Sequence, residues 1–355
     1  MSWQERADQA QRVLVDAFWD GRLGLFRVTP RRRLPALQWH YWWQAHALDA
    51  SVDAVARAGA TAEVDRVRAH IAGILRRNGG RPANDYYDDM AWMALALLRA
   101  DEVAGVQTAA LVAELWSELR GGWDPRHGGI VWRRGDTYTN TAANAPAAIL
   151  AARLHRRHGR ADDLDWARRI ATWQQATLVD PATGIVWDGI HPETDPTPSR
   201  ELYTYNQGTV VGAEVELFRR TGEREHLDRA RRTAAAALDR FSDPGTGLFR
   251  PEGAGDGGLF KGILARYLGE LARADPEPHA GVTARIRAAL SANGEAVSSA
   301  DAEPVGADWT RPTEGERSLS THLSAVLILE ALAASEAASR EGGGDVADGA
   351  PGTEG

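Results

Sequence analysis

The chain of 355 residues has no cysteine, a single lysine at position 261 and no run of about 18 apolar residues, the length that indicates a membrane-spanning helix. Without cysteine no disulfide framework can form, which fits a reducing compartment. The first residues also lack a basic segment followed by an apolar one, the pattern of a signal peptide. We therefore expect no membrane contact and a cytoplasmic protein.

Charge and aromatic content narrow the kind of partner. The net charge of −8 at pH 7 disfavours a nucleic-acid ligand. Hydrophobic residues make up 43% of the chain, which is enough for a substantial core. The 13 tryptophans are unusually many, and their indole faces can either stack on sugar rings or fill that core.

Apolar periodicity and helix breakers predict an all-α protein. The predicted helices are 3–19, 35–59, 61–77, 85–102, 106–120, 140–159, 163–177, 203–222, 224–240, 257–274, 280–292 and 317–339. Odd-numbered segments carry one apolar stripe, as Val64, Val67 and Ile71 do in the third, whereas even-numbered segments are apolar nearly all round. A striped helix lies at the surface and an all-apolar helix is enclosed. The alternation predicts an (α/α)6 barrel with six inner and six outer helices.

We expect one catalytic domain over residues 1–340, because no linker divides the chain. Residues 341–355 are acidic and rich in glycine, which is typical of a disordered tail. The connections from even to odd segments are short, whereas those from odd to even segments, such as 121–139 and 178–202, are long. In an alternating barrel the long loops share one rim, and loops of this length usually carry function.

A short repeat recurs in these long loops, with the pattern Asp-x3-Gly followed by Ile or Leu and then by Val or Phe. Its copies begin at Asp20, Asp124, Asp180 and Asp243, and the second copy has one extra glycine. Asp-Pro followed by glycine is typical of a turn. We therefore interpret these aspartates as structural and the repeat as the mark of a repetitive architecture.

The most unusual stretch is the pair Asp88-Asp89, which follows two tyrosines at the start of the apolar fourth segment. One acid in the first turn of a helix is favoured by the helix dipole, by about 0.3–1 kcal/mol. A second acid beside it in a buried helix suffers repulsion and desolvation. We therefore interpret Asp88 and Asp89 as a catalytic pair, and we expect Asp85 to be the N-cap residue.

The other inner-helix starts, and the loop before the sixth segment, carry polar and aromatic groups that a buried helix does not need. The substrate-binding candidates are Trp42, Trp43, His46, Tyr87, Trp132, Asn140, Asn144, Tyr205, Asn206, Gln207 and Lys261. Together they would line a bowl suited to a neutral, polyhydroxylated ligand. Each also has an ordinary alternative role. The tryptophans can be core residues, Asn140 can cap its helix, and Gln207 can bond loop carbonyls.

Metal chemistry is not expected. The histidines and acids lack zinc-ligand spacing such as His-Glu-x-x-His. We therefore predict a site that works without a metal or a cofactor.

Four stretches resemble glycoside hydrolase family 76, the endo-α-1,6-mannanases. In chain order they are YWWQAH from Tyr41, YDDMAW from Tyr87, TYNQG from Thr204 and FKGI from Phe260. The resemblance covers nearly the whole chain and implies an (α/α)6 barrel. It also implies an enzyme that acts on α-mannan or manno-oligosaccharides and cleaves α-1,6-mannosidic bonds with retention. We expect the protein to be a monomer.

The resemblance implies that Asp88 is the nucleophile and Asp89 the general acid/base. Retaining glycosidases place their two carboxyl groups about 5–5.5 Å apart, a separation that adjacent side chains can reach. The charge of Asp88 would raise the pKa of Asp89, which would then hold a proton for the leaving oxygen.

Two other interpretations stay open. An epimerase on the same barrel would use a histidine base, with His40, His46 and His322 as candidates. An unsaturated-uronide hydrolase would use a carboxylate clamp, which Lys261 with an arginine could supply. A non-catalytic mannan-binding protein would keep the bowl without turnover, although the intact acid pair argues against it.

Overall fold

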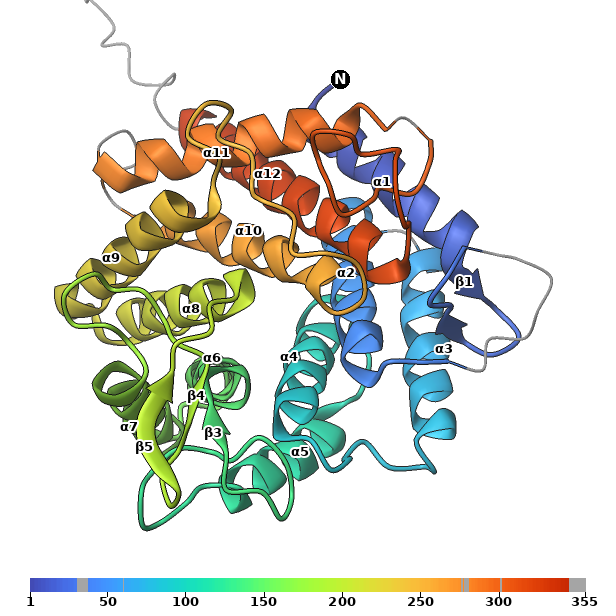
Figure 1. Ribbon diagram of the computed structural model, residues 1–355. Coiled ribbons are helices and arrows are strands. Elements are labelled where there is room, and N and C mark those ends of the chain that lie inside the picture. The colour runs from blue at the N-terminus through green and yellow to red at the C-terminus, as the bar shows by residue number, and fades with distance from the viewer. Residues whose placement is uncertain (31–37, 60, 276, 278–280, 301, 345–355) are drawn as a thin grey trace, which may run out of the picture.

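The computed structural model describes residues 1–30, 38–59, 61–275, 277, 281–300 and 302–344 (Figure 1). It confirms the all-α prediction. The helices are α1 (Trp3–Phe18), α2 (Tyr41–Ala58), α3 (Thr61–Arg77), α4 (Tyr87–Ala104), α5 (Ala109–Gly121), α6 (Thr141–His158), α7 (Ala161–Thr177), α8 (Thr204–Thr221), α9 (Arg224–Phe241), α10 (Gly257–Ala274), α11 (Gly281–Ser298) and α12 (Leu319–Gly344).

The even-numbered helices form a closed inner ring. Each packs on the next even-numbered helix, and α12 returns to α2. The odd-numbered helices lie outside: α3, α5, α7, α9 and α11 each pack on the inner helix before them, and α1 packs on α12. One continuous hydrophobic cluster contains side chains from all of these helices. The alternation of striped and all-apolar segments therefore predicted the (α/α)6 barrel correctly.

Helix ends differ from the prediction where tertiary contacts override local signals. The predicted second helix began at 35, but α2 begins at Tyr41 after an extended His40, and residues 31–37 lie outside the described chain. The predicted eleventh helix ended at 292, but α11 continues through Gly294. A Cβ there would meet Leu332 at 2.3 Å, so the glycine permits close helix packing. The predicted tail is helical as far as Gly344, and residues 345–355 lie outside the described chain.

Helix α12 is the one described helix that is long and apolar enough to cross a membrane. The segment Leu319–Arg340 meets that criterion by length and composition, but 72% of its most apolar window is buried inside the protein. It packs against α1, α10 and α11. These contacts identify α12 as an inner core helix.

Strands are short and confined to the loops. They are β1 (Trp19–Asp20), β2 (Leu25–Phe26), β3 (Thr139–Asn140), β4 (Gly189–His191) and β5 (Asp195–Ser199). β1 pairs with β2, and β3, β4 and β5 form an antiparallel sheet in that order. The absence of long strand patterns in the sequence agrees with this arrangement.

The loop repeat folds into four similar hairpins, so its aspartates are structural as predicted. In each copy the N–H of the glycine four positions after the aspartate donates to the aspartate carbonyl, at 2.8–2.9 Å. Each of these glycines has a positive φ, between 66° and 81°, which a side chain would disfavour. The aspartate side chain accepts the N–H two residues further on.

Buried amide side chains from helices hold these hairpins in place. Gln44, Asn144 and Gln207 each bond both the N–H and the carbonyl of one hairpin residue, at 2.7–3.0 Å. Asn293 accepts the N–H of Phe249 in the fourth hairpin. Because buried peptide groups need partners, these amides fix the long loops to the barrel.

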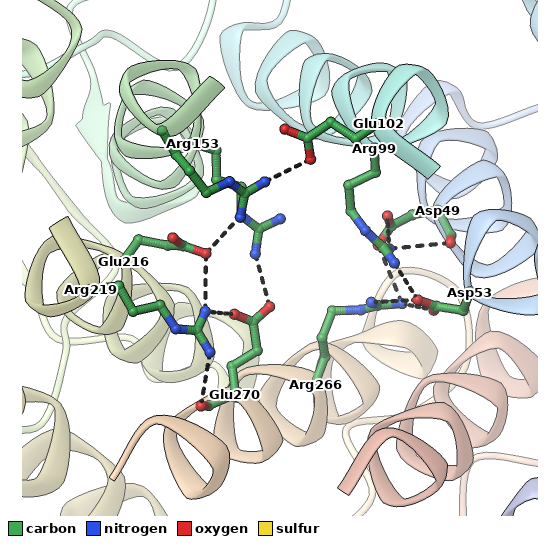
Figure 2. A network of polar contacts seen from close by, with 10 residues as sticks. Asp49, Asp53, Arg99, Glu102, Arg153, Glu216, Arg219, Arg266 and Glu270 are labelled. Atoms are coloured by element: carbon green, nitrogen blue, oxygen red, sulfur yellow. Dashed lines mark hydrogen bonds and ion pairs between the residues drawn. The ribbon is translucent and has the colours of Figure 1, made fainter. Parts of the chain in front are cut away.

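A network of buried ion pairs lies inside the inner ring, beyond the first turns of the inner helices (Figure 2). Its members come from the later turns of five inner helices: Asp49, Asp53, Arg99, Arg153, Glu216, Arg219, Arg266 and Glu270. Arg153, for example, donates to Glu216 at 2.9 Å and to Glu270 at 2.8 Å. These charged groups are paired with one another. The inner helices begin at the opposite rim, next to the long loops.

Candidate active site

The loop between α5 and α6 lies against the start of α4. Tyr86 forms an antiparallel bridge with Arg133, and the N–H of Tyr87 donates to the carbonyl of Trp132 at 2.9 Å. The extended Tyr86 is the N-cap residue of α4, so the prediction of Asp85 as the cap is wrong by one residue. The bridge explains the difference, because it fixes Tyr86 as the last extended residue and leaves Asp85 exposed in the loop.

Asp88 and Asp89 accept hydrogen bonds from different donors. The indole N–H of Trp132 donates to Asp88 Oδ2 at 3.1 Å, and the backbone N–H of Asp89 donates to Asp88 Oδ1 at 2.9 Å. Asn84 Nδ2 donates to Asp89 Oδ2 at 2.7 Å. Both acids are partly exposed, and neither forms an ion pair with another residue of the described chain. The pair is thus positioned by hydrogen bonds and open to a ligand.

The surroundings of Asp88 and Asp89 raise the pKa values of the two acids by different amounts. Burial raises the pKa of Asp88 to about 6, although hydrogen bonds from the backbone and from Trp132 act in the opposite direction. Burial and the neighbouring Asp88 charge raise the pKa of Asp89 well above its usual range. The surroundings therefore favour ionisation of Asp88 before that of Asp89.

A third acid, Asp188, lies on the Asp88 side of the site. Tyr138 Oη donates to its Oδ2 at 2.6 Å and Asn206 Nδ2 to its Oδ1 at 2.9 Å. Its charge contributes to the raised pKa of Asp88, after the larger effect of burial. Gly189 permits this arrangement, because a Cβ there would meet Tyr138 Oη at 2.5 Å.

A fourth acid, Asp256, lies on the Asp89 side. Its Oδ1 accepts the indole N–H of Trp43 at 2.9 Å and that of Trp42 at 3.2 Å. After burial and Asp88, its charge adds to the raised pKa of Asp89. Sequence analysis selected both tryptophans but missed this acid.

Four aromatic rings form a continuous strip that begins at Trp42, the residue that bonds Asp256. Trp42 lies 6.2 Å from Phe260, Phe260 lies 4.4 Å from Tyr205, and Tyr205 lies 5.9 Å from Tyr203, measured between ring centroids. All four rings are partly exposed. Partly exposed aromatic faces suit the C–H faces of sugar rings.

Five of the predicted binding residues have other roles. The amides of Asn144 and Gln207 are fully buried and hydrogen-bonded to hairpin peptides, so no group is left for a sugar. Tyr87 packs against Gly122 and beneath Arg134, toward α5. Lys261 donates to the carbonyl of Ala307 and lies 3.9 Å from the ring centroid of Trp309, which fixes the loop before α12. Asn140 caps α6.

The other candidates remain at the site. Trp42, Trp132 and Tyr205 are partly exposed around the acids. Asn206 and Trp43 are buried and hold Asp188 and Asp256, respectively. Asn206 and Trp43 therefore position Asp188 and Asp256, two acids that a ligand can reach.

His46 lies beneath this surface. It is 4% exposed, with its ring centroid 5.6 Å from Trp42 and 4.5 Å from Trp92. No described residue bonds its Nε2. Burial lowers its pKa to about 3, so the ring is neutral at neutral pH.

Two of the residues considered for an epimerase or a uronide hydrolase, His322 and Lys261, are fully engaged by other groups. Both nitrogens of His322 are engaged, Nδ1 by the N–H of Val305 and Nε2 by the carbonyl of Ala10. Lys261 is 1% exposed and engaged as described above. Neither residue has a free group for an epimerase or a uronide hydrolase. A third, His40, is partly exposed and stacks on the ring of Trp43 at 4.2 Å between ring centroids.

The missed acids had weak signals in the sequence. Asp188 follows the third hairpin by two residues, and Asp256 immediately precedes the glycines that begin α10. Both positions belong to the long-loop rim that was expected to carry function. Acids are common in loops, however, and sequence patterns alone did not distinguish these two from the rest.

Known proteins resemble this chain in sequence and fold. Mannan endo-1,6-alpha-mannosidase DCW1 of Candida glabrata is 27% identical, over 88% of this chain and 78% of that protein. The structure of the GH76A α-1,6-mannanase of a Salegentibacter species is 33% identical with a TM-score of 0.87, over 94% of this chain and 99% of that chain. An inactive variant of that mannanase, with two consecutive aspartates replaced by asparagine, is in complex with α-1,6-mannotriose; it is 32% identical, with the same coverage and TM-score.

The sequence pattern of one family matches almost the entire chain, from residue 2 to residue 341. The helix order, the inner ring and the acid pair at the start of α4 all lie within this match. The chain belongs to glycosyl hydrolase family 76.

Proposed function

We propose that the protein hydrolyses α-1,6-mannosidic bonds in mannan or manno-oligosaccharides with retention of configuration. Asp88 is the nucleophile and Asp89 the general acid/base. The observation that carries this proposal is the pair itself: two adjacent, partly exposed carboxyl groups without ion-pair partners among the described residues, whose environments favour one charged and one protonated acid. The named activities of the similar proteins supply the substrate class.

The inactive relative lost two consecutive aspartates. This chain contains two such pairs, Asp88-Asp89 and Asp162-Asp163. The second pair lies at the start of the outer helix α7, and Asp163 is 2% exposed and accepts the indole N–H of Trp116. Its position leaves Asp88-Asp89 as the pair able to meet a substrate at the inner rim.

The first chemical step forms a covalent intermediate. The Asp88 carboxylate attacks C1 of the mannose, while the bond from C1 to the glycosidic oxygen breaks. Asp89 gives its proton to that oxygen, so the departing sugar leaves as a neutral alcohol. The N–H of Trp132 holds Asp88 in place for this attack.

The second step restores the enzyme. Asp89, now ionised, takes a proton from water as the water oxygen attacks C1. The bond from C1 to Asp88 breaks and its electron pair returns to the carboxylate. Two inversions at C1 leave the product with the α configuration of the substrate.

Azide rescue separates the two roles. An aryl α-1,6-mannobioside with a good leaving group is given to Asp88→Ala and to Asp89→Ala in the presence of azide. In the first variant azide replaces the missing nucleophile and yields the β-mannosyl azide. In the second it attacks the covalent intermediate and yields the α-mannosyl azide.

The outcome is read by proton NMR of the azide products, with the exposed Asp85→Ala as a control. Reversed configurations would exchange the two roles. Wild-type-like release of sugar from α-1,6-mannan by either variant would refute the proposal.

A further inference from the structure

We propose that Asp256 binds the hydroxyl groups of the mannose that departs in the first step, and of any acceptor sugar that takes its place in the second. The proposal rests on the proposed function, because it takes Asp89 as the acid/base. It assigns a substrate-recognition role to a loop residue outside the predicted set.

The side chain of Asp256 is held rigidly at one oxygen and left open at the other. Both indole N–H donors, from Trp42 and Trp43, bond Oδ1. Asp256 is the N-cap residue of α10, yet its side chain makes no cap hydrogen bond. The residue is exposed, and no described residue donates a hydrogen bond to Oδ2. A positioned carboxylate oxygen is therefore available to a ligand.

The location of Asp256 assigns it to one side of the scissile bond. Asp188 is bonded by Tyr138, which comes from the same loop as Trp132, the residue that bonds Asp88. Asp256 is instead bonded by Trp42 and Trp43 of α2, the inner helix that packs on the other side of α4, and its charge acts on Asp89. The acid/base has to reach the oxygen that joins the two sugars, and the nucleophile has to reach C1 of the sugar that stays. Asp256 is therefore beside the departing sugar and Asp188 beside the retained one.

Groups around Asp256 add the other features of a sugar site. Trp42, which bonds it, is a partly exposed end of the aromatic strip and offers a face for stacking. His46, one helical turn after Trp42, has a buried Nε2 that no described residue bonds. A buried polar atom without a protein partner calls for water or a ligand group.

A carboxylate is well suited to this role, because it accepts charge-assisted hydrogen bonds from neighbouring sugar hydroxyls. The departing mannose is linked through O6, so its ring hydroxyls are free for recognition. In transfer to an acceptor, the O6–H of the acceptor attacks C1 of the mannosyl intermediate and a new C1–O6 bond forms. The acceptor proton passes to Asp89, and the electron pair of the broken ester bond returns to Asp88.

The test measures the transfer-to-hydrolysis ratio, that is, how often the covalent intermediate reacts with an acceptor sugar rather than with water. A 4-nitrophenyl α-1,6-mannobioside serves as donor and α-1,6-mannobiose as acceptor. Both routes use Asp89 as the base, so a changed pKa of Asp89 does not alter their ratio. We expect Asp256→Asn, which keeps an oxygen for the two indoles, to lower the transfer-to-hydrolysis ratio at least tenfold, and Asp256→Ala to lower it further.

A second measurement compares kcat/KM for α-1,6-mannotriose with that for the aryl donor, at a pH where Asp89 stays protonated in every variant. The loss should be at least tenfold larger for mannotriose, whose leaving group is a sugar. The control is Asp65→Asn, an exposed acid on the outer helix α3. Equal losses for both substrates, or an unchanged transfer ratio, would overturn the proposal. Failure of the wild-type protein to cleave either donor would instead refute the proposed function.

Discussion

The indole N–H of Trp132 lies 3.1 Å from Asp88 Oδ2, although the two residues are 44 positions apart in the chain. The bond joins the long loop before α6 to the first turn of α4. It is one of the contacts that lower the pKa of Asp88 against the larger effect of burial. A loop residue therefore contributes to the ease with which the proposed nucleophile ionises.

Replacing Trp132 with phenylalanine should raise the pKa of Asp88, because the ionised form loses a hydrogen bond. A hydrogen bond to a charged group contributes about 1.5–3 kcal/mol, so kcat/KM should fall roughly tenfold to a hundredfold. The acid limb of the pH–rate profile should move to higher pH. Trp173→Phe on the outer helix α7 serves as the matched control, and an unmoved limb in Trp132→Phe would contradict this account.

The pH–rate profile of the wild-type protein should be bell-shaped. Asp88 works ionised, so activity should rise through a pH of about 6, where its pKa lies. Asp89 works protonated in the first step, so activity should fall above its own raised pKa. Steady-state rates on α-1,6-mannotriose across the pH range measure both limbs. A profile that keeps rising toward low pH would be incompatible with Asp88 as nucleophile.

The acid pair should cost the protein stability at neutral pH. The folded-state pKa values of both acids lie above those of an unfolded chain, so the stability contributed by their protonated forms is complete at low pH. The contribution of Asp88 is lost as pH rises through about 6, and that of Asp89 as pH rises through its own raised pKa. At pH 7 the variant Asp88→Asn/Asp89→Asn should therefore unfold at a higher temperature than the wild type. Its free energy of unfolding should be larger by on the order of 2 kcal/mol. Thermal unfolding at pH 4 should show a much smaller difference, and an equal gap at both pH values would refute this explanation.

The hairpin anchors should matter for both stability and activity. Gln207→Met removes the amide that bonds the N–H and the carbonyl of Val186, both at 2.8 Å in a buried site. Leaving these groups unpaired should cost about 2–4 kcal/mol in chemical denaturation. Activity should also fall, because Asp188 follows Val186 by two residues. The exposed Gln107→Met is the control, and near-wild-type stability of Gln207→Met would show that water replaces the anchor.

The ion pairs inside the inner ring should be sensitive to the loss of one partner. Arg99 donates to Asp53 at 2.6 Å and also bonds Asp49 (Figure 2). Arg99→Met should cost about 3–5 kcal/mol, because it leaves buried carboxylates with fewer partners. The exposed pair of Arg68 and Asp65 offers a comparison, since Arg68→Met should cost about 0–1 kcal/mol. Similar losses in the two variants, measured by urea denaturation, would contradict the proposed burial effect.

Local sequence patterns specified much of the architecture. The alternation of striped and all-apolar segments predicted the inner and outer helices, because each helix must bury its own apolar surface. The Asp-x3-Gly repeat predicted turns, because its glycines adopt positive φ. Asp88 and Asp89 were selected as candidates because no local or packing role explained two adjacent acids at the start of a buried helix.

Tertiary structure decided which polar side chains reach the site. Asn144 and Asn206 have the same functional group near inner-helix starts, yet one anchors a hairpin and the other holds Asp188. The partner of each amide lies on a different loop, and the position of that loop depends on the closed ring. Asp256 likewise became a candidate only when the fold brought it beside two indoles from α2. Sequence sets which groups are available, whereas long-range packing sets which of them meet.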